Sequence, residues 1–411
     1  MFVKRKETDM KNFSVTQEAT AEKTNRKAVE ALTEDILPFW LKDAIDWENG
    51  GIITALDEVG ELYGTEKSVW FQGRALWSFS KAYTLIDRNP DYLKAAECLY
   101  RFLGKCSDTD GRMFFTVTAD GRGIQKRRYY FSETFAAIGC AEYYRASGDE
   151  QALLDARKYF DIAYGCFTGK IPTTPKFSRE TNNSKALSPV MIMLSTAQTM
   201  RAVDTEQSER YNKIANDCLR EILHGGFLTE TALLETVSVN GTPIDSPAGR
   251  VVNPGHSMEA AWFVMLEGLL TDNREAIEAG KRIIDITLPL GWDKKYGGIL
   301  SFTDVKGKPP VQLEWDMKLW WPQCETAIAA RVAYDIFKEE KYLKLYRETE
   351  EYFEKYFVDR KHGEWYGYLH YDNTVANTAK GNVFKGPFHI PRMYMIMAVM
   401  DSGKSLADYA K

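Results

Sequence analysis

Histidines are the residues in this chain whose chemistry best suits proton transfer near neutral pH, and there are few of them. Five occur among 411 residues: His224, His256, His362, His370 and His389. Three lie in connectors or at the ends of charged helical runs, where a solvated surface role is expected. His256, in NPGHSMEA, and His389, in GPFHIPR, each open a strongly apolar run. A lone histidine on an apolar helix is usually a packed core residue, but two in corresponding positions predict a shared site.

Two bases on opposite sides of a substrate suit exchange of the proton on a carbon beside a carbonyl group. Because a helix N-terminus disfavours imidazolium, we expect both rings to be neutral and able to act as bases. Glu259 follows His256 by three residues, one turn along the same face, and is expected to orient or charge that ring. Arg74 and Arg392 are the cations expected to stabilise the enediolate that forms between the two proton transfers.

The elements that carry these residues are predicted from the helical spacing of apolar residues, which dominates the chain after its first two dozen residues. Some of the predicted helices have one charged face, as in KYLKLYRETEEYFEKYF, and others are apolar on every side, as in NPGHSMEAAWFVML. A helix that is apolar on every side is buried, and a one-sided helix covers it. Extended segments at Arg112–Val117, Gly298–Phe302 and Glu364–Leu369 predict short β-hairpins in the loops. Twelve helices are predicted, near residues 25–46, 67–88, 91–106, 129–147, 149–166, 187–203, 206–223, 254–271, 273–290, 314–337, 339–357 and 389–401.

The regular alternation of the two helix types marks an internal repeat of helical hairpins. It predicts an all-α fold, an (α/α)6 barrel in which six inner helices are surrounded by six outer ones. Residues 25–411 are expected to form this single catalytic domain, and residues 1–24 a polar, mobile N-terminal extension. Because the inner helices all start at one end, polar residues of their first turns are expected to meet in one concave site. These residues are Gln72, Arg74, Ser132, Glu133, His256, Glu259, Gln323, Glu325, His389 and Arg392.

Composition excludes several classes of function. With 53 basic and 58 acidic residues, the net charge of −5 offers no footprint for nucleic acid or an anionic membrane. No apolar run reaches the length of a membrane span, and the polar first 27 residues do not resemble a secretory leader. The six cysteines occur singly, without a CxxC motif or a Cys/His cluster. We therefore expect a cytoplasmic protein without disulfides.

Six segments resemble the N-acylglucosamine 2-epimerase family, called renin-binding protein in mammals: VWFQGRALWSFSKAY, FSETFAAIGCAEYYRASGD, NPGHSMEAAWF, LEWDMKLWWPQCETAIA, GEWYGYL and FKGPFHIPR. The resemblance runs in order from about Phe39 to Met400. It implies an (α/α)6 barrel and interconversion of N-acetylglucosamine and N-acetylmannosamine. The family's catalytic histidines match His256 and His389. Residues expected to bind substrate or stabilise the intermediate are Arg74, Glu259, Trp321, Glu325 and Arg392.

Three alternative functions stay open on the sequence. The first is a 2-epimerase or aldose–ketose isomerase acting on neutral sugars such as cellobiose or mannose. Enzymes of that kind resemble this chain but usually carry an Asn and a further His on the sixth helix, where this chain has LSPVMIM with Pro189 and Met191. The second is an (α/α)6 glycosidase using two of Glu133, Glu259 and Glu325, which leaves both histidines without a task. The third is a non-catalytic sugar-binding or protein-binding barrel.

Cofactors and partners are predicted mainly from the resemblance. Family members are often activated by ATP that is not consumed, and the basic connector 168–181 lies where the family's nucleotide loop falls. Gly169, Lys170 and Lys176 are its candidate nucleotide contacts, although the connector has no P-loop motif. No metal-binding motif is present and no required cofactor is expected. A homodimer is expected, because family members commonly form one.

Overall fold

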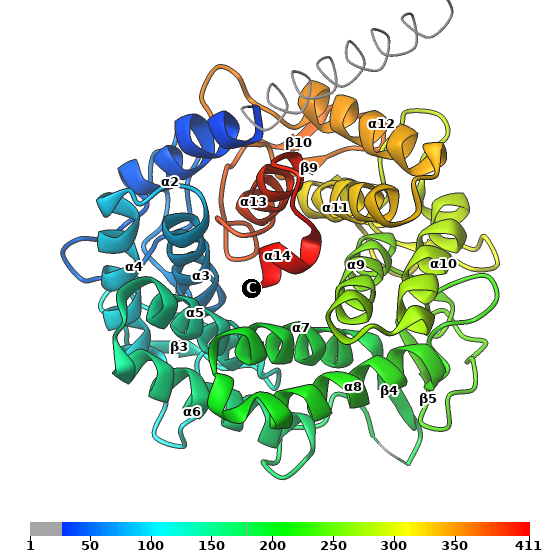
Figure 1. The fold of residues 1–411 in the computed structure, drawn as a ribbon, viewed down its shortest axis with the longest axis horizontal. Coiled ribbons are helices and arrows are strands. Elements are labelled where there is room, and N and C mark those ends of the chain that lie inside the picture. The colour runs from blue at the N-terminus through cyan, green and yellow to red at the C-terminus, as the bar shows by residue number, and fades with distance from the viewer. Residues whose placement is uncertain (1–26, 179) are drawn as a thin grey trace, which may run out of the picture.

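The computed structural model describes residues 27–178 and 180–411. The predicted N-terminal extension, residues 1–24, lies outside this range, so the division into extension and barrel stays a prediction. Within the described ranges the chain winds into two concentric rings of helices, shown in Figure 1. The inner ring contains α3 (Val69–Leu85), α5 (Phe131–Ser147), α7 (Leu187–Val203), α9 (Pro254–Thr271), α11 (Trp320–Phe337) and α13 (His389–Asp401). The outer ring contains α2 (Leu37–Asp43), α4 (Pro90–Leu103), α6 (Glu150–Phe167), α8 (Ser208–His224), α10 (Arg274–Gly291) and α12 (Glu340–Tyr356). The described chain is therefore an (α/α)6 barrel, as predicted.

The two rings differ in how the sequence distributes apolar residues along each helix. Helix α8 buries Tyr211, Ile214, Cys218 and Ile222, which recur at three- and four-residue spacing on one face. Helix α9 instead buries an unbroken run from Ala260 to Gly268, so no side of that stretch faces solvent. An outer helix therefore needs only one apolar stripe, whereas an inner helix is packed on all sides.

Short connecting elements complete the ring. Helix α2 is preceded by the π-helical segment η1 (Ala31–Ile36), which packs against α13 and so joins the beginning of the described chain to its last inner helix. Two 3₁₀ turns, η2 (Gly104–Cys106) and η3 (Thr205–Gln207), follow α4 and α7. The five-residue helix α14 (Leu406–Ala410) lies across one end of the barrel against α7, α9 and α13. Sequence periodicity did not predict α14, because five residues are too few to establish a helical period.

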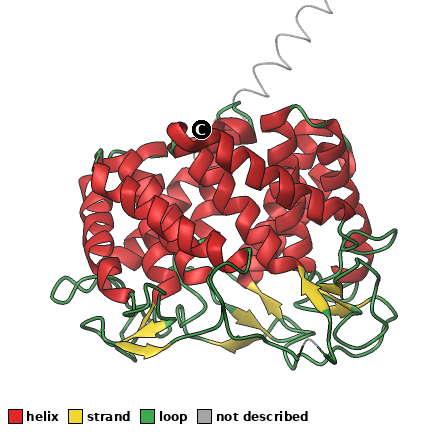
Figure 2. Ribbon diagram, turned by 90° about the horizontal axis from the view of Figure 1, so that it is seen from below, coloured by secondary structure: helices red, strands yellow, loops and turns green. Residues whose placement is uncertain are grey.

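The strands gather at the opposite end of the barrel, together with the long loops (Figure 2). The predicted segments Arg112–Val117 and Glu364–Leu369 each contain a strand that forms a hairpin with the next strand of the same connector, and strands from successive connectors pair with one another as well. Strands β1 (Lys67–Ser68), β4 (Ser184–Ala186) and β8 (Lys318–Leu319) end directly before an inner helix, and β6 (Val251–Val252) ends one residue before α9. Each strand fixes where its helix starts, and for this reason α11 begins at Trp320 and not near residue 314. The antiparallel sheets are β1 (Lys67–Ser68), β2 (Thr116–Val117) and β3 (Gly123–Gln125); β8 (Lys318–Leu319), β9 (Tyr368–Leu369) and β10 (Val375–Asn377); β4 (Ser184–Ala186) with β5 (Thr236–Ser238); and β6 (Val251–Val252) with β7 (Thr303–Asp304).

Two neighbouring inner helices approach more closely than side chains would allow. On α3, a Cβ atom added to Gly73 would lie 2.5 Å from the backbone of Phe135 on α5, and one added to Gly139 would lie 2.6 Å from the Gly73 carbonyl oxygen. The two glycines therefore face each other across the contact between α3 and α5. This contact sets the position of Arg74, the next residue on α3.

No helix in the described part of the chain is long and apolar enough to cross a membrane.

Candidate active site

His389 is the first residue of α13. Its Nδ1 lies 2.8 Å from Oε1 of Glu325, so Nδ1 carries a hydrogen that it donates to the carboxylate. Burial lowers the pKa of His389 well below its usual value, and the positive charges of Arg392 and Arg74 lower it further. His389 is therefore a neutral imidazole whose Nε2 has a free lone pair, as a general base requires.

Glu325, on α11, is fully buried and connects three side chains from two other inner helices. Besides His389 it accepts hydrogen bonds from Nε1 of Trp262 at 2.8 Å and from Nη2 of Arg392 at 2.7 Å. Arg392 also pairs with Glu259 at 2.5 Å. Burial opposes the charge of Arg392, but the two carboxylates outweigh it and raise its pKa further above the ordinary arginine value. Glu259, Glu325 and Arg392 thus form a buried ionic cluster beside His389.

His256 lies in the first turn of α9, where Asn253 caps the helix by accepting a hydrogen bond from the His256 backbone N–H. Its Nδ1 lies 3.0 Å from Oε1 of Glu235, a residue just before β5. Burial alone would lower the pKa of His256, but the charge and hydrogen bond of Glu235 outweigh it and the pKa is raised. The helix N-terminus was expected to disfavour imidazolium at both rings, but at His256 the carboxylate of Glu235 acts in the opposite direction, because its full charge exceeds the half charge of a helix end.

The indole of Trp321 lies close to both histidines. Its ring centroid is 5.3 Å from that of His256 and 5.7 Å from that of His389. Gly255 permits this position, because a Cβ atom there would lie 2.6 Å from two carbons of the indole. The glycine on α9 therefore allows an aromatic residue on α11 to contact both imidazoles.

The guanidinium group of Arg74, on α3, lies in a cage of aromatic rings. In the described part of the chain it has no hydrogen-bond acceptor. The group lies 4.0 Å from the ring centroid of Phe135 and 4.7 Å from that of Phe388, and its buried Nε has no partner. Burial lowers the pKa of Arg74 to about 9, which still leaves the group charged at neutral pH. An unpaired cation held against aromatic rings can interact with an anion that forms during a reaction.

Four of the residues expected in the site instead hold the loops. Gln72 and Gln323 hydrogen-bond the backbone of Ile52 and Ile299, respectively, with all bonds between 2.8 and 3.0 Å. Each lies two residues before a site residue, and two residues turn a helix by about 200°, so each glutamine faces away from Arg74 or Glu325. The other two are Ser132, which donates to the Phe114 carbonyl oxygen, and Glu133, which pairs with Arg112.

Sequence reasoning missed Glu235 and instead expected Glu259 to orient or charge the ring of His256. Glu259 shares a helix face with His256, but its hydrogen-bonded partner is Arg392, while Glu235 holds the ring. Glu235 is 21 residues before His256 and belongs to no helix. In the sequence Glu235 lies inside the predicted connector between the helices near 206–223 and 254–271, a position that many acidic residues share.

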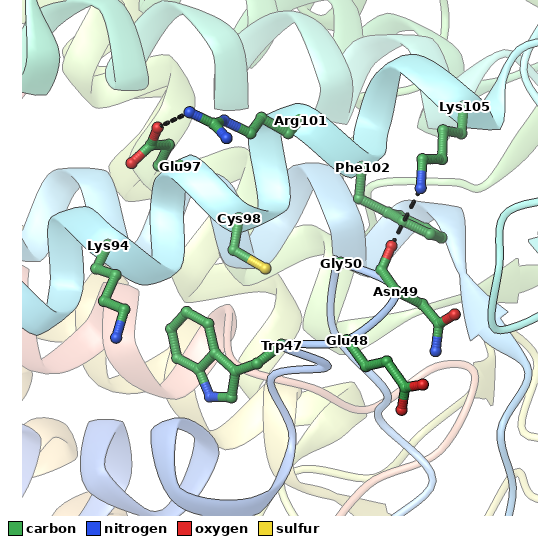
Figure 3. A pocket seen from close by; sticks show the side chains of 10 residues that line it. All are labelled: Trp47, Glu48, Asn49, Gly50, Lys94, Glu97, Cys98, Arg101, Phe102 and Lys105. Atoms are coloured by element: carbon green, nitrogen blue, oxygen red, sulfur yellow. Dashed lines mark hydrogen bonds and ion pairs between the residues drawn. The ribbon is translucent and has the colours of Figure 1, made fainter.

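Possible metal and nucleotide positions were also compared with the structure. Ligand atoms of Glu259, Glu325 and His389 lie within 4.8 Å of one another, a grouping that sequence spacing did not predict, but Arg392 bonds both carboxylates. The three candidate nucleotide contacts are all exposed in the connector between α6 and β4: Gly169, Lys170 and Lys176. A hollow of about 360 Å³ on the outer wall, beside α4, contains none of the predicted site residues (Figure 3).

Comparison with known proteins decides the family. The sequence model of the N-acylglucosamine 2-epimerase (GlcNAc 2-epimerase) family matches residues 50–387. The chain belongs to this family. It is 33% identical to N-acylglucosamine 2-epimerase of Bos taurus over 379 residues, which cover 87% of this chain and 86% of the relative. With the Homo sapiens enzyme of the same name it shares 32% identity over 374 residues, which cover 87% and 85%. The protein is thus an enzyme, an isomerase of the carbohydrate epimerase class.

Solved structures support the same fold. Cellobiose 2-epimerase from Bacillus thermoamylovorans superposes with a TM-score of 0.80 at 21% identity, covering 91% of this chain and 98% of the other. A D-mannose isomerase gives a TM-score of 0.79 at 18% identity, covering 90% and 97%. At such identities the likeness concerns the barrel architecture alone.

Proposed function

We propose that this epimerase interconverts N-acetylglucosamine and N-acetylmannosamine by moving the proton on C2 of the open-chain sugar. The observation that carries the proposal is the pair of imidazoles on one indole, each bonded through Nδ1 to a carboxylate. This arrangement leaves the Nε2 atom of each ring free for the substrate. The names of the relatives that are about one-third identical supply the sugar.

In the proposed reaction one histidine removes the C2 proton and the other returns a proton to the opposite face. The electron pair of the broken C–H bond moves into a C1–C2 double bond, and the aldehyde oxygen becomes an oxyanion. Arg74 is the residue proposed to stabilise this charge; it has no carboxylate partner among the described residues. Protonation at C2 restores the aldehyde with inverted configuration, so no electron or group leaves the substrate.

A neutral-sugar epimerase or isomerase is the second candidate. The start of α7 favours an N-acyl group, because Val190 and Met191 there are buried and apolar, without the additional histidine of the neutral-sugar enzymes. The glycosidase alternative is disfavoured by the carboxylates themselves. Glu259 and Glu325 bond Arg392, and Glu133 bonds Arg112, so none is free to protonate a glycosidic oxygen.

The test is incubation of the purified protein with N-acetylmannosamine, N-acetylglucosamine, mannose, glucose or cellobiose in D₂O, followed by NMR. We expect the two N-acetylhexosamines to interconvert in the presence of a chelator, with deuterium at C2 of the product. Faster turnover of mannose or cellobiose would assign the protein to the second candidate. Product without deuterium at C2 would contradict transfer through a solvent-exchanging base.

We also propose three properties that accompany this family assignment: a homodimer, a cytoplasmic location and activation by ATP that is not consumed. Support for the last is the basic connector with Gly169, Lys170 and Lys176, which is exposed and therefore accessible to a nucleotide. A non-hydrolysable ATP analogue is expected to raise both the epimerisation rate and the melting temperature. Equal values with and without the analogue would remove the nucleotide from the proposal.

A further inference from the structure

The two histidines are each bonded to a carboxylate, but the two carboxylates are not equivalent. Glu325 divides its charge among His389, Arg392 and the indole N–H of Trp262. Within the described chain, the side chain of Glu235 has a hydrogen bond only to His256. An unshared carboxylate attracts a proton onto its imidazole more strongly than one already neutralised by a guanidinium group.

The other charged groups increase this difference. His256 lies in the field of Glu235, Glu259 and Glu325, all negative, and near His389 across Trp321. His389 lies in the field of Arg392 and Arg74, both positive, as well as Glu259. The side chain of His389 is 8% exposed and that of His256 is 28% exposed, so water also solvates a charge better on His256. Charge and solvation therefore both favour a proton on His256 over one on His389.

We propose that Glu235 is a positioning residue that holds His256 as imidazolium in the resting enzyme, so that His256 begins as the acid while His389 begins as the base. This inference rests on the proposed epimerase function and assigns a role to a residue outside the predicted site. Nδ1–H of His256 stays on Glu235, and Nε2–H faces the substrate. When Nε2 of His389 takes the C2 proton, His256 gives its Nε2 proton to the opposite face of C2.

Both directions of the reaction then use the same total protonation state, with one proton shared by the two imidazoles. Below the pKa of His389 both rings are protonated and the base is lost. Above the pKa of His256 both are neutral and the acid is lost. Because the pKa of His389 is lowered and that of His256 is raised, kcat/KM is expected to have a broad plateau around neutral pH. The acidic and basic limbs of the kcat/KM profile must fall at the same pH values for both epimers. The reason is that the ratio of the two kcat/KM values is the equilibrium constant of the reaction, which does not depend on pH.

The decisive variant is Glu235→Gln, which keeps an oxygen acceptor for Nδ1–H but removes the negative charge. We expect the basic limb of kcat/KM to move to lower pH while the acidic limb, set by His389, stays in place. At pH values above the basic limb, kcat/KM of the variant then falls tenfold for each pH unit by which the limb has moved. On the plateau the loss of kcat/KM is small. A uniform loss of rate at every pH would reveal a purely structural role and overturn the proposal. Glu230→Gln changes an exposed carboxylate five residues earlier and is the matched control, with an unchanged profile expected.

A second measurement does not depend on turnover. In protein labelled with ¹³C-histidine, the signal of His256 is identified by its absence from His256→Asn, and its titration is followed without substrate. We expect its midpoint to fall in Glu235→Gln but not in Glu230→Gln. An unchanged midpoint would overturn the role of Glu235, whereas failure of the wild-type protein to exchange the C2 hydrogen of any sugar would overturn the proposed function.

Discussion

Glu325 is the residue on which the side chains around His389 depend, because it accepts hydrogen bonds from α9 and from two residues of α13. It fixes which nitrogen of His389 carries the hydrogen, and it partly neutralises Arg392. Arg74, by contrast, has aromatic neighbours and no carboxylate partner among the described residues. Of these two arginines, Arg74 is thus the one with charge available to an intermediate, and Arg392 serves the protein's own carboxylates.

At the residue scale, the two histidines are expected to be separately essential for net epimerisation but not for hydrogen exchange. His256→Asn and His389→Asn should each lower net epimerisation by about 10²–10⁴-fold, because each removes the acid or base of one face. Each variant should keep some exchange of the C2 hydrogen of one epimer, catalysed by the remaining histidine. The measurement is deuterium incorporation from D₂O into each pure epimer. Substantial epimerisation by both single variants would refute a two-base mechanism.

At the scale of elements, the loops that precede the inner helices are held in place by a recurring buried ion pair. Nζ of a fully buried lysine bonds an aspartate at the start of a tight loop in three places: Lys67 to Asp46 at 2.8 Å, Lys318 to Asp293 at 2.6 Å and Lys380 to Asp359 at 2.7 Å. The glutamines Gln72 and Gln323 bind two of the same loops. The starts of α3 and α11, the helices that carry Arg74 and Glu325, are therefore anchored from the loop side.

The glycine contact between α3 and α5 gives the prediction at this scale. Gly73→Ala would place a methyl group 2.5 Å from the Phe135 backbone, and the helices must separate to admit it. We expect a loss of about 1–3 kcal/mol of stability, seen as a lower melting temperature, and reduced activity because Arg74 is the adjacent residue. Gly104→Ala is the control, since an added Cβ atom there has nothing within 4 Å. Equal melting temperatures for the two variants would show that the contact is not limiting.

At the scale of the whole molecule, the two ends of the barrel differ, because strands and long loops gather at one end and α14 lies across the other. Helix α14 covers the end opposite the loops and buries Leu406 and Tyr409. Beneath it a cavity of about 50 Å³ extends to Trp262, Phe388 and Arg392, the residues under the catalytic groups. Glu142 Oε2 and the Tyr409 hydroxyl are buried there without a hydrogen-bond partner in residues 27–178 and 180–411, so the cavity has the size and polarity to hold a few water molecules.

Removal of residues 405–411 is expected to destabilise the barrel without changing its chemistry. Two buried side chains would be lost, each worth roughly 1.5–3 kcal/mol, and the cavity would open to solvent. The expected result is a lower melting temperature, with epimerisation retained at temperatures where the variant stays folded. Deletion of Lys411 alone, which is exposed, is the control. If the longer deletion melted like this control, α14 would not be a structural closure.

The sequence by itself determined the barrel and the helix on which each histidine lies. Whether a helix is amphipathic or apolar on every side is visible in its own residues, because burial on one side or on all sides leaves a local pattern. The pattern assigned α9 and α13 to the inner ring, and with them the positions of His256 and His389 at helix starts. Helix ends were less accurate where a strand precedes the helix, as at Trp320, because strand pairing involves residues far away in the sequence.

Only the tertiary structure decided the direction and partner of each side chain. Gln72 and Arg74 share a helical turn, but the rotation of α3 about its axis turns one toward the loops and the other toward the barrel interior. Glu235 reaches His256 from a loop that no periodicity links to α9, and it raises the pKa of a ring whose charge the helix start alone would disfavour. The physical reason is that helix formation depends on neighbours within a few residues. The charge on an imidazole depends on every ionised group within several ångströms, whatever its position in the sequence.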